Sequence, residues 1–161
     1  CTIRSISRKR LMTEIENFLN KNICKYLIDY YESYQGNLKQ YGDRKIIQLL
    51  QIKVDDNIVK DVIEVYRKIR PNQNLNNIEL ICWPGKGYHD WHDDTIYYDH
   101  TTITYLNDDY VGGKTLVGDY EVQPSVGKLI IFNSKIKHKV TNLEKNNRYV
   151  IVAWYTNADR K

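Results

Sequence analysis

Cysteine is scarce in this sequence, and long apolar runs are missing from it. The three cysteines, Cys1, Cys24 and Cys82, are an odd number without C-x-x-C spacing, which argues against a disulfide framework and a thiolate zinc site. This usage suits a reducing compartment, so we expect an intracellular, cytoplasmic protein. No stretch approaches the ~18 consecutive apolar residues of a membrane-spanning helix, so we expect a soluble protein without a membrane partner.

Charge of one sign is only mildly in excess, with a formal net charge of +4. The basic opening CTIRSISRKR is not followed by an apolar stretch, so the sequence predicts no secretory signal there. Its cations could attract an acidic partner or RNA, but a solvated basic end is the simpler interpretation, and nucleic acid is not the expected partner. The abundant Tyr, Asn, Ile and Lys are typical of AT-rich genomes, including viral and bacterial ones.

The length and patterning predict one domain with two parts. The 161 residues, 42% apolar and 27% charged, are enough for one domain with a hydrophobic core and too few for two comfortable ones. Neither an internal repeat nor a low-complexity linker divides them. We expect a single domain over residues 1–161, helical over 10–72, with a β-core over about 77–157.

Residues 10–72 carry helical periodicity. Thr13 and Glu16 have capping-box spacing beside apolar residues, which predicts a first helix. A second helix is predicted over residues 24–31, and the apolar run within 45–54 predicts a strand. Residues 55–57 offer N-cap chemistry for a further helix that reaches Ile69, because the following Arg-Pro-Asn cannot continue it.

From about residue 77, short apolar segments alternate with Gly, Asn, Asp and Pro. They are NIELICW, TTITYL, KTLV, YEVQP, KLIIFN, KHKV and RYVIVAWY. Several short strands at this spacing predict a sandwich or barrel of the jelly-roll kind. The expected fold class is therefore α+β or mainly β, a double-stranded β-helix core with N-terminal helices packed on it.

The segment GYHDWHDD contains the densest group of possible metal ligands. On an extended segment, His92 and Asp94 lie on one face and can reach a single ion. A third ligand must come from elsewhere, and His138 is the only histidine downstream of His100. Two imidazoles and one carboxylate form a facial triad that leaves coordination positions open. Solvated surface charge is the alternative interpretation. His89 and His100 lack an H-x-D partner and are not expected to bind the metal.

Arg148 favours a functional interpretation of this cluster. It opens the strand RYVIVAWY, where alternation puts it on one face with Val150, Val152 and Trp154. Burying an arginine there is costly unless it meets an anion, and a guanidinium suits a carboxylate bidentately. The anion is either an internal Asp or Glu or the carboxylate of a bound dicarboxylic acid.

Several motifs together resemble a known family. In order, they are CWPGKGY, HDD, TYLNDDYVGGKT, VQPSVGKLIIF, His138 and RYVIVAWY. From about Glu79 to Asp159, half the chain, the sequence resembles the catalytic core of the prolyl 4-hydroxylase branch of the Fe(II)/2-oxoglutarate-dependent dioxygenases. The ending RYVIVAWYTNAD is especially similar to the hypoxia-inducible-factor prolyl hydroxylases.

The resemblance implies a cofactor set and the residues that hold it. Fe(II) would be bound by His92, Asp94 and His138, and Arg148 would anchor 2-oxoglutarate, with O2 as the other cosubstrate and ascorbate as a stimulating reductant. Tyr105 would hydrogen-bond the same 2-oxoglutarate carboxylate.

Four further residues are assigned to the pocket by the same resemblance. Ile103 and Val140 would line the cosubstrate pocket, and Trp154 would sit beside the metal, toward the substrate. Trp83 stands where a close relative has tyrosine, and its indole can donate a hydrogen bond but cannot accept one. Core packing is the alternative role for Tyr105, Trp83 and Trp154.

The implied activity is hydroxylation of prolyl residues in a protein or peptide, with release of succinate and CO2. Aromatic residues near the site, Trp91 and Trp154 among them, could grip a proline ring or could simply pack, and residues 93–101 could act as a lid. Hydroxylation of lysine or another side chain stays open. A nucleic-acid demethylase is disfavoured, because such enzymes typically carry a second arginine where this chain has Trp154. A non-catalytic jelly-roll binding module is the remaining alternative.

Overall fold

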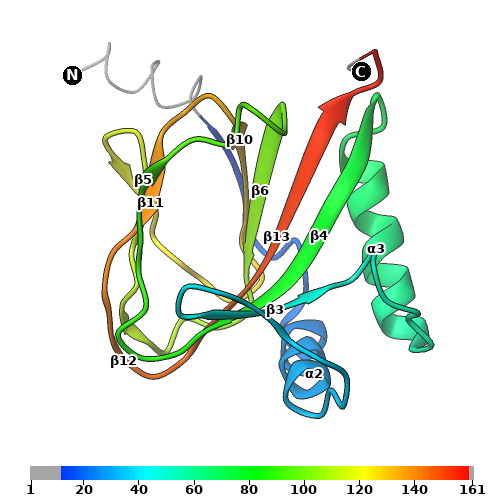
Figure 1. The fold of residues 1–161 in the computed structure, drawn as a ribbon, viewed down its shortest axis with the longest axis horizontal. Coiled ribbons are helices and arrows are strands. Elements are labelled where there is room, and N and C mark those ends of the chain that lie inside the picture. The colour runs from blue at the N-terminus through cyan, green and yellow to red at the C-terminus, as the bar shows by residue number, and fades with distance from the viewer. Residues whose placement is uncertain (1–11, 160–161) are drawn as a thin grey trace.

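The computed structural model describes residues 12–159 as two antiparallel sheets that face each other, with helices outside the larger one (Figure 1). The larger sheet has the order β1-β10-β6-β13-β4-β3-β2. In chain order, its strands are β1 (Met12–Ile15), β2 (Lys39–Tyr41), β3 (Arg44–Gln48), β4 (Gln73–Trp83), β6 (His100–Tyr105), β10 (Leu129–Asn133) and β13 (Arg148–Asn157).

The smaller sheet has the order β5-β11-β8-β9. Its strands are β5 (His89–His92), β8 (Thr115–Val117), β9 (Tyr120–Glu121) and β11 (His138–Val140), and a separate ladder joins β7 (Val111–Gly112) to β12 (Leu143–Lys145). This arrangement is the predicted jelly roll, so the expected fold class is confirmed.

Two helices cover the outer face of the larger sheet (Figure 1). Helix α2 (Lys21–Glu32) begins after Asn20, whose side chain accepts a hydrogen bond from the Ile23 amide. Helix α3 (Asn57–Ile69) begins after Asp56, which caps the Val59 amide in the same way. These N-caps satisfy amides that have no partner within the helix, and both predicted helices are confirmed. Within residues 12–159, no helix is long and apolar enough to cross a membrane.

Two local predictions within residues 10–72 are wrong. The helix expected at residue 13 is strand β1, which pairs with β10 at the edge of the sheet. There Lys128 binds Glu14 at 2.9 Å and Glu16 at 3.4 Å, so tertiary pairing overrides the local capping signal. The strand expected over residues 45–54 ends at Gln48, because the apolar residues beyond it pack against the core from a loop.

The alternation along β13 separates two hydrophobic clusters. Tyr149, Ile151, Ala153 and Tyr155 pack toward the helices, as alternation predicts. Val150 belongs instead to the cluster between the sheets. Side chains on this inner face of the larger sheet therefore point at the smaller sheet.

A buried carboxylate also lies on the inner face. Glu79 of β4 pairs in register with Gln48 of β3, and its Oε2 accepts hydrogen bonds from the amides of Gln48 at 3.2 Å and Asn77 at 3.3 Å. Burial raises the pKa of Glu79, although these hydrogen bonds partly oppose the shift. The folded protein therefore binds this proton more tightly than the unfolded chain does, and stability falls as the pH rises through the raised pKa.

We expect Glu79→Gln to stabilise the protein at pH 8 and to have little effect at pH 4. At pH 8 the substitution removes a buried charge, and the new amide can donate to the unpartnered Gln48 Oε1, so the gain should be about 1 kcal/mol. Thermal unfolding at the two pH values measures it, with the exposed Glu144→Gln as a control. Equal effects of the two substitutions, or a loss of stability at pH 8, would contradict the prediction.

Candidate functional site

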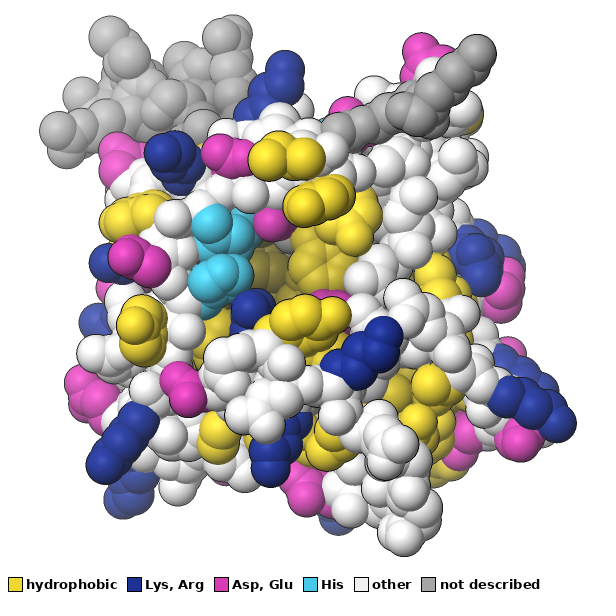
Figure 2. Space-filling view, viewed as in Figure 1, with side chains coloured by type: hydrophobic (Ala, Val, Ile, Leu, Met, Phe, Trp, Pro, Cys, Tyr) yellow, Lys and Arg dark blue, Asp and Glu magenta, His cyan; other side chains and the backbone are white. Residues whose placement is uncertain are grey.

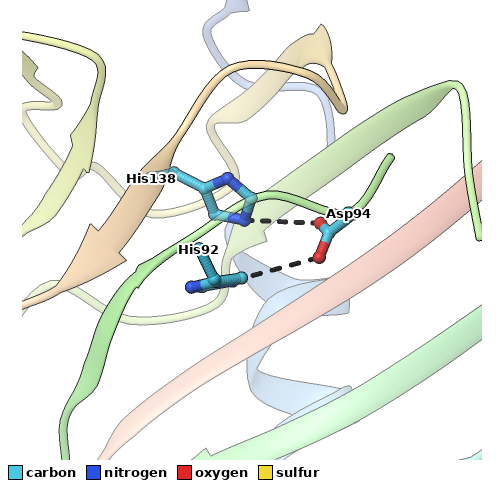
Figure 3. Close-up of side chains that lie close together, drawn as sticks. All are labelled: His92, Asp94 and His138. Atoms are coloured by element: carbon cyan, nitrogen blue, oxygen red, sulfur yellow. Dashed lines mark ion pairs between the residues drawn. The ribbon is translucent and has the colours of Figure 1, made fainter. Parts of the chain in front are cut away.

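Three predicted ligand residues converge between the sheets. The ligand atoms of His92, Asp94 and His138 all lie within 4.8 Å of one another (Figure 3). The two histidines are paired across β5 and β11, which brings their rings to a centroid distance of 4.1 Å. Asp94 follows the end of β5, where its amide donates to the Ser134 carbonyl at 3.0 Å. The fold thus joins two segments that are distant in sequence.

Backbone carbonyls determine which nitrogen each histidine presents. Nδ1 of His92 lies 2.7 Å from the Asp90 carbonyl, and Nδ1 of His138 lies 2.9 Å from the Ile136 carbonyl. Because a carbonyl only accepts hydrogen bonds, each Nδ1 carries the proton, and the lone pair of each neutral ring is on Nε2. Those Nε2 atoms face Asp94, at 3.3 Å for His138 and 4.0 Å for His92.

Hydrogen bonds also orient the carboxylate. Asp94 Oδ2 accepts from Thr101 Oγ1 at 3.0 Å and from Trp154 Nε1 at 3.1 Å. Burial raises the pKa of Asp94, but the nearby His138 and the hydrogen bonds from Trp154 and Thr101 outweigh it, and the net pKa is lowered. Burial also lowers the pKa of His92. A charged carboxylate and neutral imidazoles are the protonation states that bind a metal, and this donor set fits Fe(II) in a facial triad.

Arg148 is buried without a counter-ion. It is only 1% exposed, and none of the ion pairs found among residues 12–159 involves it. Its Nη2 donates to Thr115 Oγ1 at 3.0 Å, while its Nε has no partner in the described part of the chain. The internal salt bridge considered from the sequence is therefore not found within residues 12–159, and a buried, uncompensated guanidinium is costly. The group is free to receive the carboxylate of a bound acid.

Thr115 joins the two predicted binding residues and was not anticipated. Its hydroxyl accepts from Arg148 and also from the Tyr105 hydroxyl, at 2.6 Å. Thr115 lies on β8 of the smaller sheet, opposite Val140 of β11. The sequence signal was the GGKT run, but only the pairing of the sheets brings Thr115 to Arg148.

One pocket contains both features (Figure 2). In the space-filling view, histidine, basic and apolar side chains surround a hollow in the surface. The metal-ligand candidates and Arg148 line this pocket, and so do four other predicted residues: Trp83, Ile103, Val140 and Trp154. Two arginine groups flank the Trp83 ring, with Arg44 at 5.0 Å and Arg148 at 5.5 Å from its centroid. Arg44 was not anticipated from the sequence.

Trp91 is the one predicted site residue that lies away from these groups. It is 45% exposed, and the Lys139 amine lies 5.2 Å above its ring. It does not line the pocket that holds the three converging residues. Its predicted contact with substrate therefore requires a ligand that extends beyond the pocket.

The two remaining histidines differ in their surroundings. His89 lines the pocket, and its ring stacks on His92 at 3.6 Å. Burial and the nearby Arg44 charge lower the pKa of His89 to about 3, so the ring is neutral. His100 lies elsewhere, with Nδ1 2.8 Å from the Gln73 amide. Neither belongs to the converging group of metal-ligand atoms found in the described residues.

Comparison with known proteins agrees with this geometry. Residues 78–156 match the family model described as the 2OG-Fe(II) oxygenase superfamily. None of the curated proteins matches the sequence at a significant level. Similar solved structures include the viral collagen prolyl hydroxylase of Paramecium bursaria Chlorella virus-1, with a TM-score of 0.70 and 13% identity over 92% of this chain and 97% of that one.

Two cellular structures are similar as well. A Pseudomonas putida prolyl-4-hydroxylase has a TM-score of 0.71 and 15% identity, covering 97% of both chains. A Trichoplax adhaerens prolyl hydroxylase, solved with a peptide of hypoxia-inducible factor, has a TM-score of 0.65 and 19% identity over 93% of this chain and 85% of that one. At these identities the likeness is one of fold.

Proposed function

The chain belongs to the 2OG-Fe(II) oxygenase superfamily, and from this premise we propose that it hydroxylates prolyl residues of a protein or peptide. It is a 2-oxoglutarate-dependent dioxygenase. The observation that supports the activity most directly is the convergence of two imidazoles and one carboxylate in the same pocket as an uncompensated arginine. We assign Fe(II) to His92, Asp94 and His138 as ligands.

Arg148 is the proposed anchor of 2-oxoglutarate. A dicarboxylic acid that reaches the metal with one end places its other carboxylate near this guanidinium, where a bidentate, charge-assisted pair can form. The hydroxyls of Thr115 and Tyr105 lie beside the same group. Ile103 and Val140 form the apolar walls between the two ends.

The protein's own residues position the reaction, and the hard chemistry belongs to the bound groups. Bound Fe(II) would activate O2, one oxygen atom of which would hydroxylate the C–H bond while the other would oxidise 2-oxoglutarate to succinate and CO2. Thr101 and Trp154 hold the Asp94 carboxylate in one orientation. Trp154 also lines the pocket, and we assign it a place beside the metal, toward the substrate. Ascorbate would serve only to keep the iron reduced.

Prolyl substrates are supported by relatives and by the pocket rim. The similar structures are described as prolyl hydroxylases, and one holds a peptide. Aromatic side chains stand exposed on the segments around the site, with Tyr88 at 59%, Trp91 at 45% and Tyr97 at 69%. Rings of this kind can pack on a proline in an extended peptide. Tyr98 stacks on Trp154 at 5.4 Å, which supports residues 93–101 as a cover over the site.

A panel of proline-containing peptides tests the proposal. Incubation with the enzyme, Fe(II), 2-oxoglutarate and ascorbate should add one oxygen to proline, detected by tandem mass spectrometry, with matching release of succinate. A gain of oxygen on lysine or on a nucleobase instead would move the activity to another branch of the family. Absence of succinate release with every substrate class would favour a non-catalytic module.

A further inference from the structure

The pocket holds a second arginine whose charge the proposed reaction does not use. Arg44 lies on β3 next to Lys45, which pairs with Cys82 of β4, and the neighbouring Trp83 of β4 pairs with Arg148 of β13. Strand β4 lies between β3 and β13, and both guanidinium groups lie near the Trp83 ring, Arg44 at 5.0 Å and Arg148 at 5.5 Å from its centroid. We assign the distal carboxylate of 2-oxoglutarate to Arg148, which also contacts Thr115, so this carboxylate is not assigned to Arg44.

The hydrogen-bond partners of Arg44 are a backbone carbonyl and a histidine ring. Its Nε donates to the Tyr41 carbonyl at 3.3 Å, and its Nη1 lies 3.3 Å from Nδ1 of His89. No ion pair within residues 12–159 includes it. Its Nη2 donates no hydrogen bond that is found in that range either. Because Arg44 lines the pocket, these free N–H groups can meet a ligand there.

The balance of charges in the pocket also singles out Arg44. Among the residues that line it, Asp94, Arg148 and Arg44 are the only Asp, Glu, Lys or Arg residues. With Fe(II) and doubly charged 2-oxoglutarate bound, the metal, the cosubstrate, Asp94 and Arg148 together carry no net charge. Arg44 is then the one lining charge without an ion-pair partner, because the buried Glu79 acts on it without forming an ion pair in the described chain. The partial burial of Arg44 makes this unpaired state unfavourable until an anion arrives.

The geometry suits a carboxylate in particular. The guanidinium lies over the Trp83 ring at 5.0 Å, and stacking of this kind holds its plane while the N–H edge stays free. A planar edge of paired N–H donors matches the two oxygens of a carboxylate. Arg44 also links the sheets, because His89 belongs to β5 of the smaller sheet and Arg44 to β3 of the larger one. A ligand that enters the pocket can therefore contact Arg44.

We propose that Arg44 is a substrate-binding residue that selects an acidic side chain, Asp or Glu, close to the hydroxylated residue of the peptide. This inference rests on the proposed function for the identity of the substrate as a peptide. It requires a negative charge on the peptide substrate, which binding of the metal and of 2-oxoglutarate does not require.

Binding of matched peptides tests the proposal. Short synthetic peptides carry a central proline and differ at one neighbouring position, which is Glu, Gln or Lys, on either side of the proline. Isothermal titration calorimetry uses protein loaded with Mn(II) and 2-oxoglutarate without O2. In the favoured position, Glu should bind about tenfold tighter than Gln, as expected for a charge-assisted hydrogen bond. Arg44→Gln should abolish this preference, and Arg44→Glu should reverse it in favour of Lys.

Controls separate recognition from folding and from cosubstrate binding. Arg67→Gln removes an exposed arginine of α3 and should keep the full Glu preference. Arg44→Lys should retain part of it if the fold is intact, because it keeps the charge without the planar fork. The affinity for 2-oxoglutarate should be the same in wild type and Arg44→Gln, since Arg148 anchors that ligand.

Two outcomes would overturn the inference. One is an equal affinity of wild type for Glu and Gln peptides at every position, including no measurable binding. The other is a Glu preference that survives in Arg44→Gln. Peptides with alanine in place of proline distinguish a failure of the proposed role of Arg44 from a failure of the proposed prolyl hydroxylation. If they bind with the same charge preference and no proline is hydroxylated, Arg44 selects acidic peptides and the prolyl assignment is wrong.

Discussion

Replacing His138 by alanine is expected to abolish turnover of 2-oxoglutarate and binding of a divalent metal. The substitution removes one of three donors and leaves Asp94 and His92 without the third corner of the triad. Loss of an outer partner of a ligand already costs about tenfold to a hundredfold in affinity or activity, so loss of a ligand should cost more. Succinate release measures turnover, and electron paramagnetic resonance of added Mn(II) measures metal binding.

His100→Ala is the matched control for this experiment. It removes the same side chain from a position where the ring contacts Gln73 and Arg70 instead of the metal-ligand group. The control should bind Mn(II) with wild-type affinity. Turnover close to that of wild type in His138→Ala would refute the assignment of the triad.

Replacing Arg148 by glutamine is expected to raise the KM for 2-oxoglutarate on the order of a hundredfold, because it removes one partner of a buried charge pair in the loaded enzyme. The kcat at saturating 2-oxoglutarate should change much less, since Arg148 is not among the metal ligands. Thr115→Val should raise the KM in the same direction but by a smaller factor, because it removes only a neutral hydroxyl. Initial rates of succinate release over a range of 2-oxoglutarate concentrations measure both effects.

Thermal unfolding distinguishes a binding role of Arg148 from a structural one. Without 2-oxoglutarate the buried guanidinium has no counter-ion in the described chain, so the glutamine variant should unfold at a Tm no lower than that of wild type. Addition of 2-oxoglutarate and Mn(II) should raise the Tm of wild type by mass action. In the variant, Mn(II) should still raise the Tm, but 2-oxoglutarate should raise it little further. A large drop in Tm without ligand would show that Arg148 mainly supports the fold.

Regular periodicity was the most predictable part of the fold. The two helices and the strands of the β-core repeat apolar residues at intervals that follow from backbone geometry. Strand β13 is the clearest case, because its alternation separates the faces of Arg148 and Tyr149 correctly. The segments at residues 13–19 and 45–54 were predicted wrongly, since pairing with β10 and burial in a loop are contacts that local patterns do not contain.

The site was predictable where a motif placed several chemical groups close together in sequence. His92 and Asp94 are two residues apart, and His138 was reached only because few histidines follow them. Thr115 and Arg44 were missed for one physical reason. Each reaches the pocket from a strand whose position depends on long-range pairing, β8 against β11 and β3 against β4.

The direct pairing of His92 with His138 also bears on how the domain holds together. These histidines stand opposite each other on neighbouring strands, although most of the β-core separates them in sequence. An ion bound by both histidines would cross-link β5 to β11 much as a disulfide does, and it would close the long loop between them. Without the ion, the backbone hydrogen bonds of two short strands alone must offset the entropic cost of closing that loop. The smaller sheet would then owe part of its rigidity to the metal.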